Sequence, residues 1–377
     1  MRNVLGIARF TAALSGFLIS FACDLTEPLT NPENWHWIAS SSGWGHACAL
    51  SADGRLACWG ANDRYQLGTG DSSDREEPSL VRSPILFREV SAGGQHTCGI
   101  DVEQRLWCWG ANHSGQLGDG TSRDRSEPVE VIIGGTFTQV SAGAEYTCAV
   151  RITGEGLCWG ANQDGQGGNG TVSDDGVMPS PISGGLTFIA ISAGHTHSCG
   201  LTNKSVGYCW GRNQTGKLGT GTLISSASPV TIWSAVRDFQ GLRAGDTHSC
   251  GLDMQGRGWC WGGNNFGEVE NNSSVIRGSP VLRSDDLLLD LGVGEKWTCA
   301  LFVRGDVRCW GVRWDSMSVA GSHPISLEGW TPALSSSETP VALSVGARHA
   351  CVITDERNLV CWGRYPCATK GLTACLG

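Results

Sequence analysis

Large and small residues alternate in a short segment that recurs seven times along the chain. Around Cys98, for example, His96 and Ile100 lie two residues away on either side, and Thr97 falls between them. Because alternate residues of a β-strand point to the same face, the cysteine shares a face with bulky side chains. The other face carries only Ala, Thr, Ser or Gly in each repeat, with Val352 as the exception. The pattern predicts seven strands, each with one wide and one narrow face.

A second cysteine follows each first one after nine intervening residues and is itself followed by Trp-Gly. The pairs are Cys48 and Cys58, Cys98 and Cys108, Cys148 and Cys158, Cys199 and Cys209, Cys250 and Cys260, Cys299 and Cys309, and Cys351 and Cys361. A turn at Asp53-Gly54 predicts a hairpin that places Cys48 opposite Cys58 and small Ala47 opposite Trp59. Opposed residues at a non-hydrogen-bonded position have the Cβ separation that a disulfide requires, ~3.5–4.5 Å.

We therefore expect one disulfide in each repeat, and a further one between Cys367 and Cys375 in the C-terminal tail. In the chain-entropy model, a bridge that closes so short a loop stabilises the fold by ~3 kcal/mol. A zinc site is the competing interpretation of paired cysteines. Zinc ligands are usually separated by two to four residues, and one pair supplies only two of four ligands, so no metal site is predicted.

The repeat length and strand content predict the fold class. Successive first cysteines are separated by 49 to 52 residues, and each repeat holds about four short strands. Seven four-stranded repeats of this length are typical of an all-β, seven-bladed β-propeller. A proline precedes each first cysteine: Pro28, Pro78, Pro128, Pro179, Pro229, Pro280 and Pro332. The last repeat ends near Gly363, so Pro28 to about Leu29 is expected to add the strand that the final blade lacks and to close the ring.

The repeats resemble those of the regulator of chromosome condensation family in its bacterial form. The resemblance rests on Ala92-Gly93, on His96-Thr97-Cys98, and on the run Cys108 to Thr121, and it covers about Pro28 to Gly363. It implies a seven-bladed propeller and little about activity. Known members include nucleotide-exchange factors, ultraviolet-B photoreceptors with clustered tryptophans, and secreted bacterial propellers that cover β-lactamases with one rim. Residues 264–268 match this run less well, and residues 312–315 replace it with a different sequence. These departures reflect either neutral drift or a specific contact surface.

The N-terminus is typical of an export signal. Arg2 and Arg9 precede an uncharged stretch that ends before Cys23, and this stretch is shorter than the ~20 apolar residues of a membrane span. We predict a signal peptide at 1–22, a tether at 23–27, the propeller at 28–363 and a tail at 364–377. Cys23 is either lipidated or an odd thiol after ordinary cleavage. The protein is then periplasmic, attached to the outer-membrane surface or secreted, and touches a membrane only through that lipid.

Charge and candidate chemistry narrow the function. The formal net charge of −9 argues against a nucleic-acid partner, because phosphate binding needs basic residues. Five of the nine histidines occupy one repeated position, where Tyr146 and Trp297 substitute, so they are interpreted as packing residues with one hydrogen bond. His195 lies outside that position and is the only catalytic candidate. Loops at 71–74, 119–124 and 174–175 hold aspartates that could bind calcium, although their spacing differs and solvated turns are the simpler interpretation.

Two functions remain open. The first is a non-catalytic, monomeric binding scaffold outside the cytoplasm, without a cofactor, which contacts a protein or glycan through rim loops. Variable residues after each Trp-Gly are the expected contacts: Tyr65, His113, Phe266, Trp314 and Tyr365. The second is an envelope enzyme, a lyase or hydrolase, with its site at the propeller channel. A deep pocket with clustered charges favours the enzyme, and a flat rim with exposed aromatic residues favours the scaffold.

Overall fold

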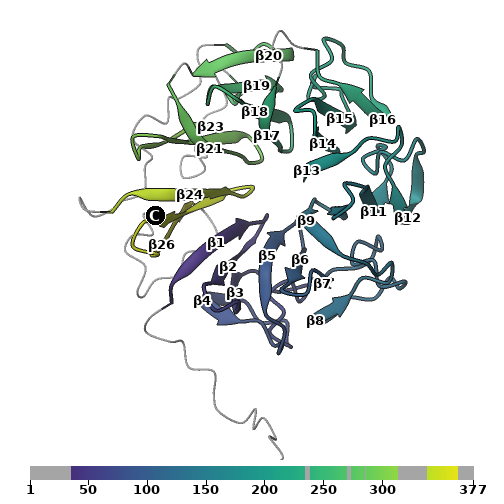
Figure 1. Cartoon of the computed structure of the whole chain (residues 1–377), viewed down its shortest axis with the longest axis vertical. Coiled ribbons are helices and arrows are strands. Elements are labelled where there is room, and N and C mark those ends of the chain that lie inside the picture. The colour runs from purple at the N-terminus through teal and green to yellow at the C-terminus, as the bar shows by residue number, and fades with distance from the viewer. Residues whose placement is uncertain (1–34, 234–237, 270–272, 285, 313–337, 364–377) are drawn as a thin grey trace, which may run out of the picture. The chain divides into compact units, whose positions relative to one another are not determined.

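The computed structural model describes residues 35–233, 238–269, 273–284, 286–312 and 338–363. Every described strand belongs to the compact unit Asn31–Gly377. Five sheets of four strands and two of three strands follow one another around a central axis (Figure 1). A pocket on this axis, lined by residues in or next to all seven sheets, marks a central channel. The fold is thus an all-β propeller of seven blades, as predicted. No helix that could cross a membrane occurs in the part of the chain that is described.

Each blade is an antiparallel meander that begins at the channel. The first, innermost strands are β1 (Trp37–Ser42), β5 (Phe87–Ala92), β9 (Phe137–Ala142), β13 (Phe188–Ala193), β17 (Phe239–Ala244), β21 (Leu288–Val293) and β24 (Pro340–Val345). The second strands are β2 (His46–Ser51), β6 (His96–Asp101), β10 (Tyr146–Arg151), β14 (His197–Thr202), β18 (His248–Asp253), β22 (Trp297–Phe302) and β25 (His349–Thr354). The third strands are β3 (Leu56–Gly60), β7 (Leu106–Gly110), β11 (Gly156–Asn162), β15 (Gly207–Gly211), β19 (Gly258–Gly262), β23 (Val307–Gly311) and β26 (Leu359–Gly363). The fourth strands, at the outer edge, are β4 (Arg75–Leu80), β8 (Arg125–Glu130), β12 (Ser173–Pro181), β16 (Ser226–Thr231) and β20 (Arg277–Ser284).

The repeated proline marks the outer strand rather than the start of a blade. Pro78 lies in β4, which pairs with β3 of the same blade. Proline lacks an N–H group, so an edge strand tolerates it best. The sequence repeat and the blade are therefore offset by one strand. By this rule Pro28 would belong to the last blade, as the closure hypothesis requires, but Pro28 lies outside the described residues and that strand stays a prediction.

The predicted hairpin register is confirmed in every blade. Cys48 pairs with Cys58 and Ala47 with Trp59, and the other repeats follow the same register. The seven disulfides predicted within the repeats are present, with Cα atoms 4.0–4.1 Å apart, as in the closer, non-hydrogen-bonded pairs of an antiparallel ladder. Cys367 and Cys375 lie outside the described residues, as does Cys23.

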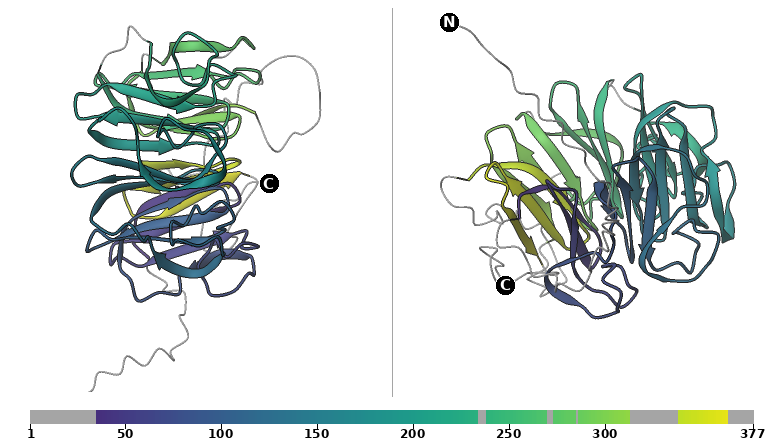
Figure 2. Two further views of the ribbon diagram at one scale, coloured as in Figure 1. Left: turned by 90° about the vertical axis from the view of Figure 1, so that its right-hand side faces the viewer. Right: turned by 60° about the horizontal axis from the view of Figure 1, so that its bottom comes forward.

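The core is divided into seven clusters, each shared by two neighbouring blades. In one of them, the wide face of β6, with Cys98 and Ile100, packs on Trp159 and Ala149 of the next blade. The next blade needs small residues such as Ala149 at this contact because the Trp159 indole of its Cys-Trp-Gly strand occupies the space between the blades. The cluster of Ile353 with Trp59 joins the last blade to the first, so the ring closes by packing between described residues. Figure 2 shows the blades side by side in two further views.

Candidate functional site

A ring of backbone hydrogen bonds surrounds one end of the channel. We call the loops between the first and second strands the inner loops; they are residues 43–45, 93–95, 143–145, 194–196, 245–247, 294–296 and 346–348. Each inner loop donates an N–H to a carbonyl of the next blade's inner loop, at N···O distances of 2.9 to 3.4 Å. The seven bonds run from Trp44 to Gly93, Gly94 to Gly143, Ala144 to Gly194, His195 to Gly245, Asp246 to Gly294, Glu295 to Ala347 and Ala347 to Gly43. The last bond links the seventh blade to the first and completes the ring.

The glycine in each inner loop is required by this close approach. A Cβ atom on Gly194 would lie 2.4 Å from the carbonyl oxygen of Gly245, and one on Gly346 would lie 2.3 Å from that of Gly43. The other five blades show the same obstruction at 2.4 to 2.7 Å, at Gly43, Gly93, Gly143, Gly245 and Gly294. The repeated Gly therefore fixes the loops in place, while the residue after it is free to vary.

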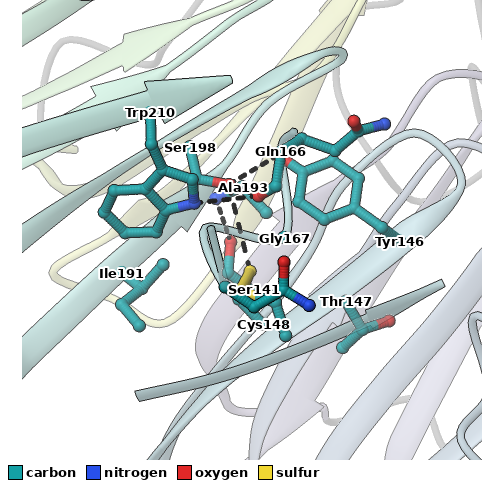
Figure 3. Close-up of a disulfide and its surroundings, with 12 residues drawn as sticks. Ser141, Tyr146, Thr147, Cys148, Gln166, Gly167, Ile191, Ala193, Ser198 and Trp210 are labelled. Atoms are coloured by element: carbon teal, nitrogen blue, oxygen red, sulfur yellow. Dashed lines mark hydrogen bonds between the residues drawn. A yellow bond between two sulfur atoms is a disulfide. The ribbon is translucent and has the colours of Figure 1, made fainter. Parts of the chain in front are cut away.

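A second set of contacts locks each blade to the next, and it involves the repeated histidines. The Nε2 atom of His96 lies 2.8 Å from the Thr147 hydroxyl, which itself donates to the carbonyl of Gln116. Since the hydroxyl hydrogen is used for that carbonyl, the imidazole must donate its Nε2–H. Trp159 Nε1 donates to the same carbonyl at 2.9 Å. Figure 3 shows the equivalent contacts around the disulfide of Cys148, with Trp210 and Ser198 on Gln166.

Four of the five repeated histidines are packing residues with one hydrogen bond, as the sequence predicted. His46, His96, His197 and His248 each bond one hydroxyl of the next blade. Burial lowers the pKa of His46 to about 4 and that of His96 to about 3, so the rings are neutral at physiological pH. For His349 the equivalent position in the next blade is Ala47, which has no hydroxyl, and neither ring nitrogen of His349 is bonded within the described structure. The contact at the ring closure therefore lacks one polar link.

The loops between the third and fourth strands, here called the outer loops, are built on a repeated asparagine. Asn62 Oδ1 accepts the N–H of Leu67, and its Nδ2 donates to backbone carbonyls of Asp71 and Ser73. Asp74 accepts the N–H of Asn62, and in the next blade Asp119 is bonded to Thr121 and Arg125. These aspartates thus hold the loop together, and no group of three side chains able to hold a metal occurs in the described ranges.

A cavity of about 490 Å³ lies at the channel mouth, where the inner loops meet the first outer loop. Its wall contains Trp44 from the first blade, His195 from the fourth, and Asp246, Glu295 and Arg348 from the fifth to seventh. The ring centroids of Trp44 and His195 are 4.7 Å apart at an interplanar angle of 74°, an edge-to-face contact. These residues are far apart in sequence, and only the closed ring brings them together.

The charged groups of the cavity are ordered by two pairs. His195 Nδ1 lies 2.8 Å from Asp246 Oδ1, and Arg348 Nε lies 3.1 Å from Glu295 Oε2. Burial is the largest single influence on the pKa of Asp246 and would raise it, but the hydrogen bond from His195 and the attraction of neighbouring cationic groups, including Lys217, together lower the pKa below its usual value. Behind the wall, Lys217 Nζ donates to Thr196 Oγ1 and to the Asp246 carbonyl, and its burial lowers its pKa to about 8.

Three of the five predicted contact residues, Tyr65, His113 and Phe266, lie on the outer loops, on the same face as the cavity. His113 Nε2 approaches Glu145 at 3.4 Å, and Phe266, whose exposure is 42%, lies below the Lys296 ammonium. Tyr65 has φ 63°, at a position where four other blades have glycine. Trp314 and Tyr365 lie outside the described residues. None of these outer-loop residues lines the cavity, so their role as contacts stays a prediction.

His195 was the only catalytic candidate in the sequence, and the structure gives it two partners, Asp246 and Trp44. Sequence reasoning missed Trp44, Asp246 and Glu295. The available signal was the variable position after each inner-loop glycine, which reads Trp44, Gly94, Ala144, His195, Asp246, Glu295 and Ala347 in successive blades. That column holds charged and aromatic residues that the fold itself does not need.

Family models and known proteins agree with this architecture. A model of the regulator of chromosome condensation (RCC1) repeat matches residues 53–100, 103–150, 154–201 and 208–252, and a second model of that repeat matches 38–66, 87–116, 137–166 and 341–364. The chain belongs to the RCC1-repeat family. RCC1-repeat propellers form a family of protein-binding scaffolds, which is the coarse function predicted from the sequence.

The similar RCC1-repeat proteins are larger or distant. Human HERC4 is 33% identical over 132 residues, which are 33% of this chain and 12% of HERC4. The human E3 ubiquitin-protein ligase HERC2 is 27% identical over 190 residues, covering 46% of this chain and 4% of that protein. This chain therefore spans only a small part of these relatives.

Among solved structures, human WBSCR16 has a TM-score of 0.73 at 19% identity and covers 85% of this chain and 88% of its own. Prp20p of Saccharomyces cerevisiae has a TM-score of 0.67 at 20% identity, covering 83% of this chain and 82% of its own. The ectodomain of the Arabidopsis thaliana receptor kinase ACR4 has a TM-score of 0.57 at 18% identity, covering 88% and 97%. At these identities the comparison supports the shared fold alone.

Proposed function

We propose that this chain is an exported RCC1-repeat propeller that binds a partner protein with the face formed by its inner and outer loops. The observation that carries the proposal is Trp44, a 42% exposed indole held over an open cavity by a loop whose backbone is fixed in the ring. Exposed tryptophans on a rigid frame are typical anchors of protein interfaces, because little conformational entropy is lost on binding.

Tyr65 supports the same face. Its backbone lies in the left-handed region, which non-glycine residues occupy at a cost, and sister blades place Gly115, Gly165, Gly216 and Gly267 there. A bulky aromatic side chain in such a position is better explained by a contact than by folding. Prp20p, which shares the fold, is described with binding properties to Gsp1p and histones, so a protein partner has a precedent in the family.

Export is supported by the disulfides and by the N-terminal sequence. Seven disulfides persist in oxidising compartments and are rare in the reducing cytosol. The ACR4 ectodomain, which has a similar fold, shows that a propeller of this kind can be located outside the cytoplasm. Intact-mass measurement of protein from its own cells tests this part: removal of residues 1–22 supports export, and an added acyl mass on Cys23 supports lipid attachment.

The binding proposal is tested by capture with immobilised, oxidised protein, followed by measurement of affinity for the partner identified. Trp44→Ala and Tyr65→Gly are expected to weaken binding without lowering the melting temperature, and Val102→Ala on the opposite face serves as the control. Equal affinity for all variants would refute this face as the contact surface. Binding of oligosaccharides instead of protein would change the partner class to a glycan.

A channel enzyme is the second candidate, favoured by the His195–Asp246 pair in the cavity. A histidine oriented by a carboxylate can act as a general base when a nucleophile or substrate lies next to it. Lyase and hydrolase substrates turned over by the native protein but not by His195→Asn would establish this alternative and set the scaffold aside.

A further inference from the structure

Resting on the proposed protein-binding face, we propose that the channel-mouth cavity receives an arginine side chain of the partner. The cavity wall contains the carboxylates of Asp63, Asp246 and Glu295 but only one guanidinium, that of Arg348. Three carboxylates outnumber the one guanidinium and the one imidazole of the lining, so the wall has an excess of negative charge. Charge of this sign favours a cationic guest and disfavours an anionic one.

The spacing of the carboxylates suits a polyatomic cation rather than a metal ion. They belong to different blades around a space of about 490 Å³, and the described residues contain no group of three side chains that could hold a metal. A calcium or zinc ion needs its ligands within about 2.0–2.6 Å of one point. A guanidinium is planar, carries five donors and can bond two separated carboxylates at once.

Acceptor atoms remain available on these carboxylates. Asp246 uses Oδ1 for His195, and Asp63 uses Oδ1 for Gln66 Nε2 at 3.0 Å. Glu295 uses Oε2 for Arg348 at 3.1 Å, and Lys296 Nζ lies 3.8 Å from Glu295 Oε1. An ionised carboxylate has two oxygens and about four acceptor sites, so each group can accept a further hydrogen bond from a guest. The existing pairs keep the side chains in position before the guest arrives, which lowers the entropy cost of binding.

Trp44 supplies the second half of the site. Guanidinium groups stack on indole faces through cation–π attraction, and tryptophan is the best aromatic partner for it. His195 contacts Trp44 edge-to-face and is bonded to Asp246, so the three residues hold the aromatic and the carboxylate in one fixed arrangement. The cavity volume lies in the range of small-ligand clefts, about 300–1,000 Å³, and leaves room for the residues beside the arginine.

The test uses the full oxidised protein and two peptides, acetyl-Gly-Arg-Gly-amide and its isosteric neutral counterpart with citrulline. Binding is followed by calorimetry and by the indole N–H signal in NMR that disappears in Trp44→Ala. The arginine peptide is expected to bind saturably and the citrulline peptide not to bind. Trp44→Leu, which keeps an apolar side chain but removes the ring, is expected to weaken binding about two- to fivefold.

Asp246→Asn and Glu295→Gln are each expected to weaken binding by at least about twofold. Glu145→Gln is the charge-matched control, because Glu145 is an exposed acid on the same face that does not line the cavity. Melting temperatures of all variants show whether each is folded. Equal binding of both peptides, no saturable binding up to about 10 mM, or an effect of Glu145→Gln as large as that of Asp246→Asn would overturn the inference.

Failure of this inference and failure of the proposed function are distinguishable. If Trp44→Ala abolishes partner binding but the arginine peptide does not bind, the face is a contact surface and the arginine assignment is wrong. If the peptide binds but no partner interaction depends on Trp44, the cavity has the chemistry inferred and the scaffold proposal is wrong.

Discussion

Glu268 offers a quantitative test of how the outer loops are built. In three blades a glutamine side chain accepts the N–H of the residue two positions earlier, as Gln116 does from Ser114 at 2.9 Å. Glu268 occupies that position in the fifth blade and accepts the N–H of Phe266 at 2.7 Å, with 1% of its surface exposed. Burial raises the pKa of Glu268 to about 7, since desolvation outweighs the backbone hydrogen bonds and the attraction of Lys296.

The size and sign of the effect follow from this pKa. A pKa raised from 4.5 to about 7 corresponds to about 3 kcal/mol, at 1.36 kcal/mol for each pKa unit. Between these two pH values the native state binds more protons than the unfolded state, so this residue's contribution to the free energy of unfolding falls as pH rises. The loss is complete above about pH 7. Glu268→Gln keeps the acceptor and removes the charge, so it is expected to stabilise the protein at pH 8 and to change little at pH 4.

The assay is urea unfolding of native protein and Glu268→Gln across pH 4 to 8 under oxidising conditions, compared as a difference curve. Other titrating groups, including Glu89, whose pKa burial also raises to about 7, are common to both proteins and cancel. Gln116→Glu is the reverse control and is expected to destabilise at pH 8 more than at pH 4. The difference is the free energy of unfolding of Glu268→Gln minus that of the native protein. A difference that does not change over this pH range, or that increases as the pH is lowered, would refute the reasoning.

Three further predictions concern the ring itself. Gly194→Ala, whose Cβ meets the Gly245 carbonyl, is expected to lower stability by about 1–3 kcal/mol in urea unfolding, whereas Gly241→Ala, with nothing nearer than 3.8 Å, is not. Ala47→Ser would supply His349 with a hydroxyl partner and is expected to raise the free energy of unfolding by about 1 kcal/mol; an unchanged or lower value would contradict the interblade role of the hydroxyl. Complete reduction of the disulfides, verified by a thiol count, is expected to lower the melting temperature, because each bridge contributes about 2–4 kcal/mol; equal melting of oxidised and reduced protein would show that packing alone sustains the fold.

The fold could be predicted from the sequence because its strongest signals are local. The alternation around Cys98, the nine-residue spacing to Cys108 and the Asp53-Gly54 turn determine the hairpin and its register, and the repeat count gives seven blades. The offset between repeat and blade was less visible, because Pro78 is a property of an edge strand whose partner is known only after pairing.

The candidate site could not be predicted in the same way. Trp44 and His195 are 151 positions apart in the sequence, and no local pattern links them; their contact depends on ring closure and on the channel diameter. The predicted contact residues Tyr65 and Phe266 lie on the outer loops, on the same face as the cavity, but neither lines it. For residues that meet only when the propeller ring closes, the sequence offers one indication: the residue type at their position differs from repeat to repeat.

The inner loops separate the residues that hold the ring from those that can define a binding site. Gly194 and its six equivalents have no space for a side chain, and the histidines and hydroxyls behind them are fully buried, so changes there alter stability. The next position, which holds His195 in the fourth blade, contributes only backbone groups to the ring: its N–H in every blade and, at Ala347, also its carbonyl. Any non-proline residue supplies these groups, so this position can change its side chain without loss of the ring. Substitutions at the seven equivalent positions around the channel can therefore change the charge and shape of the cavity while the propeller stays the same. In this chain three of these positions hold Trp44, Asp246 and Glu295.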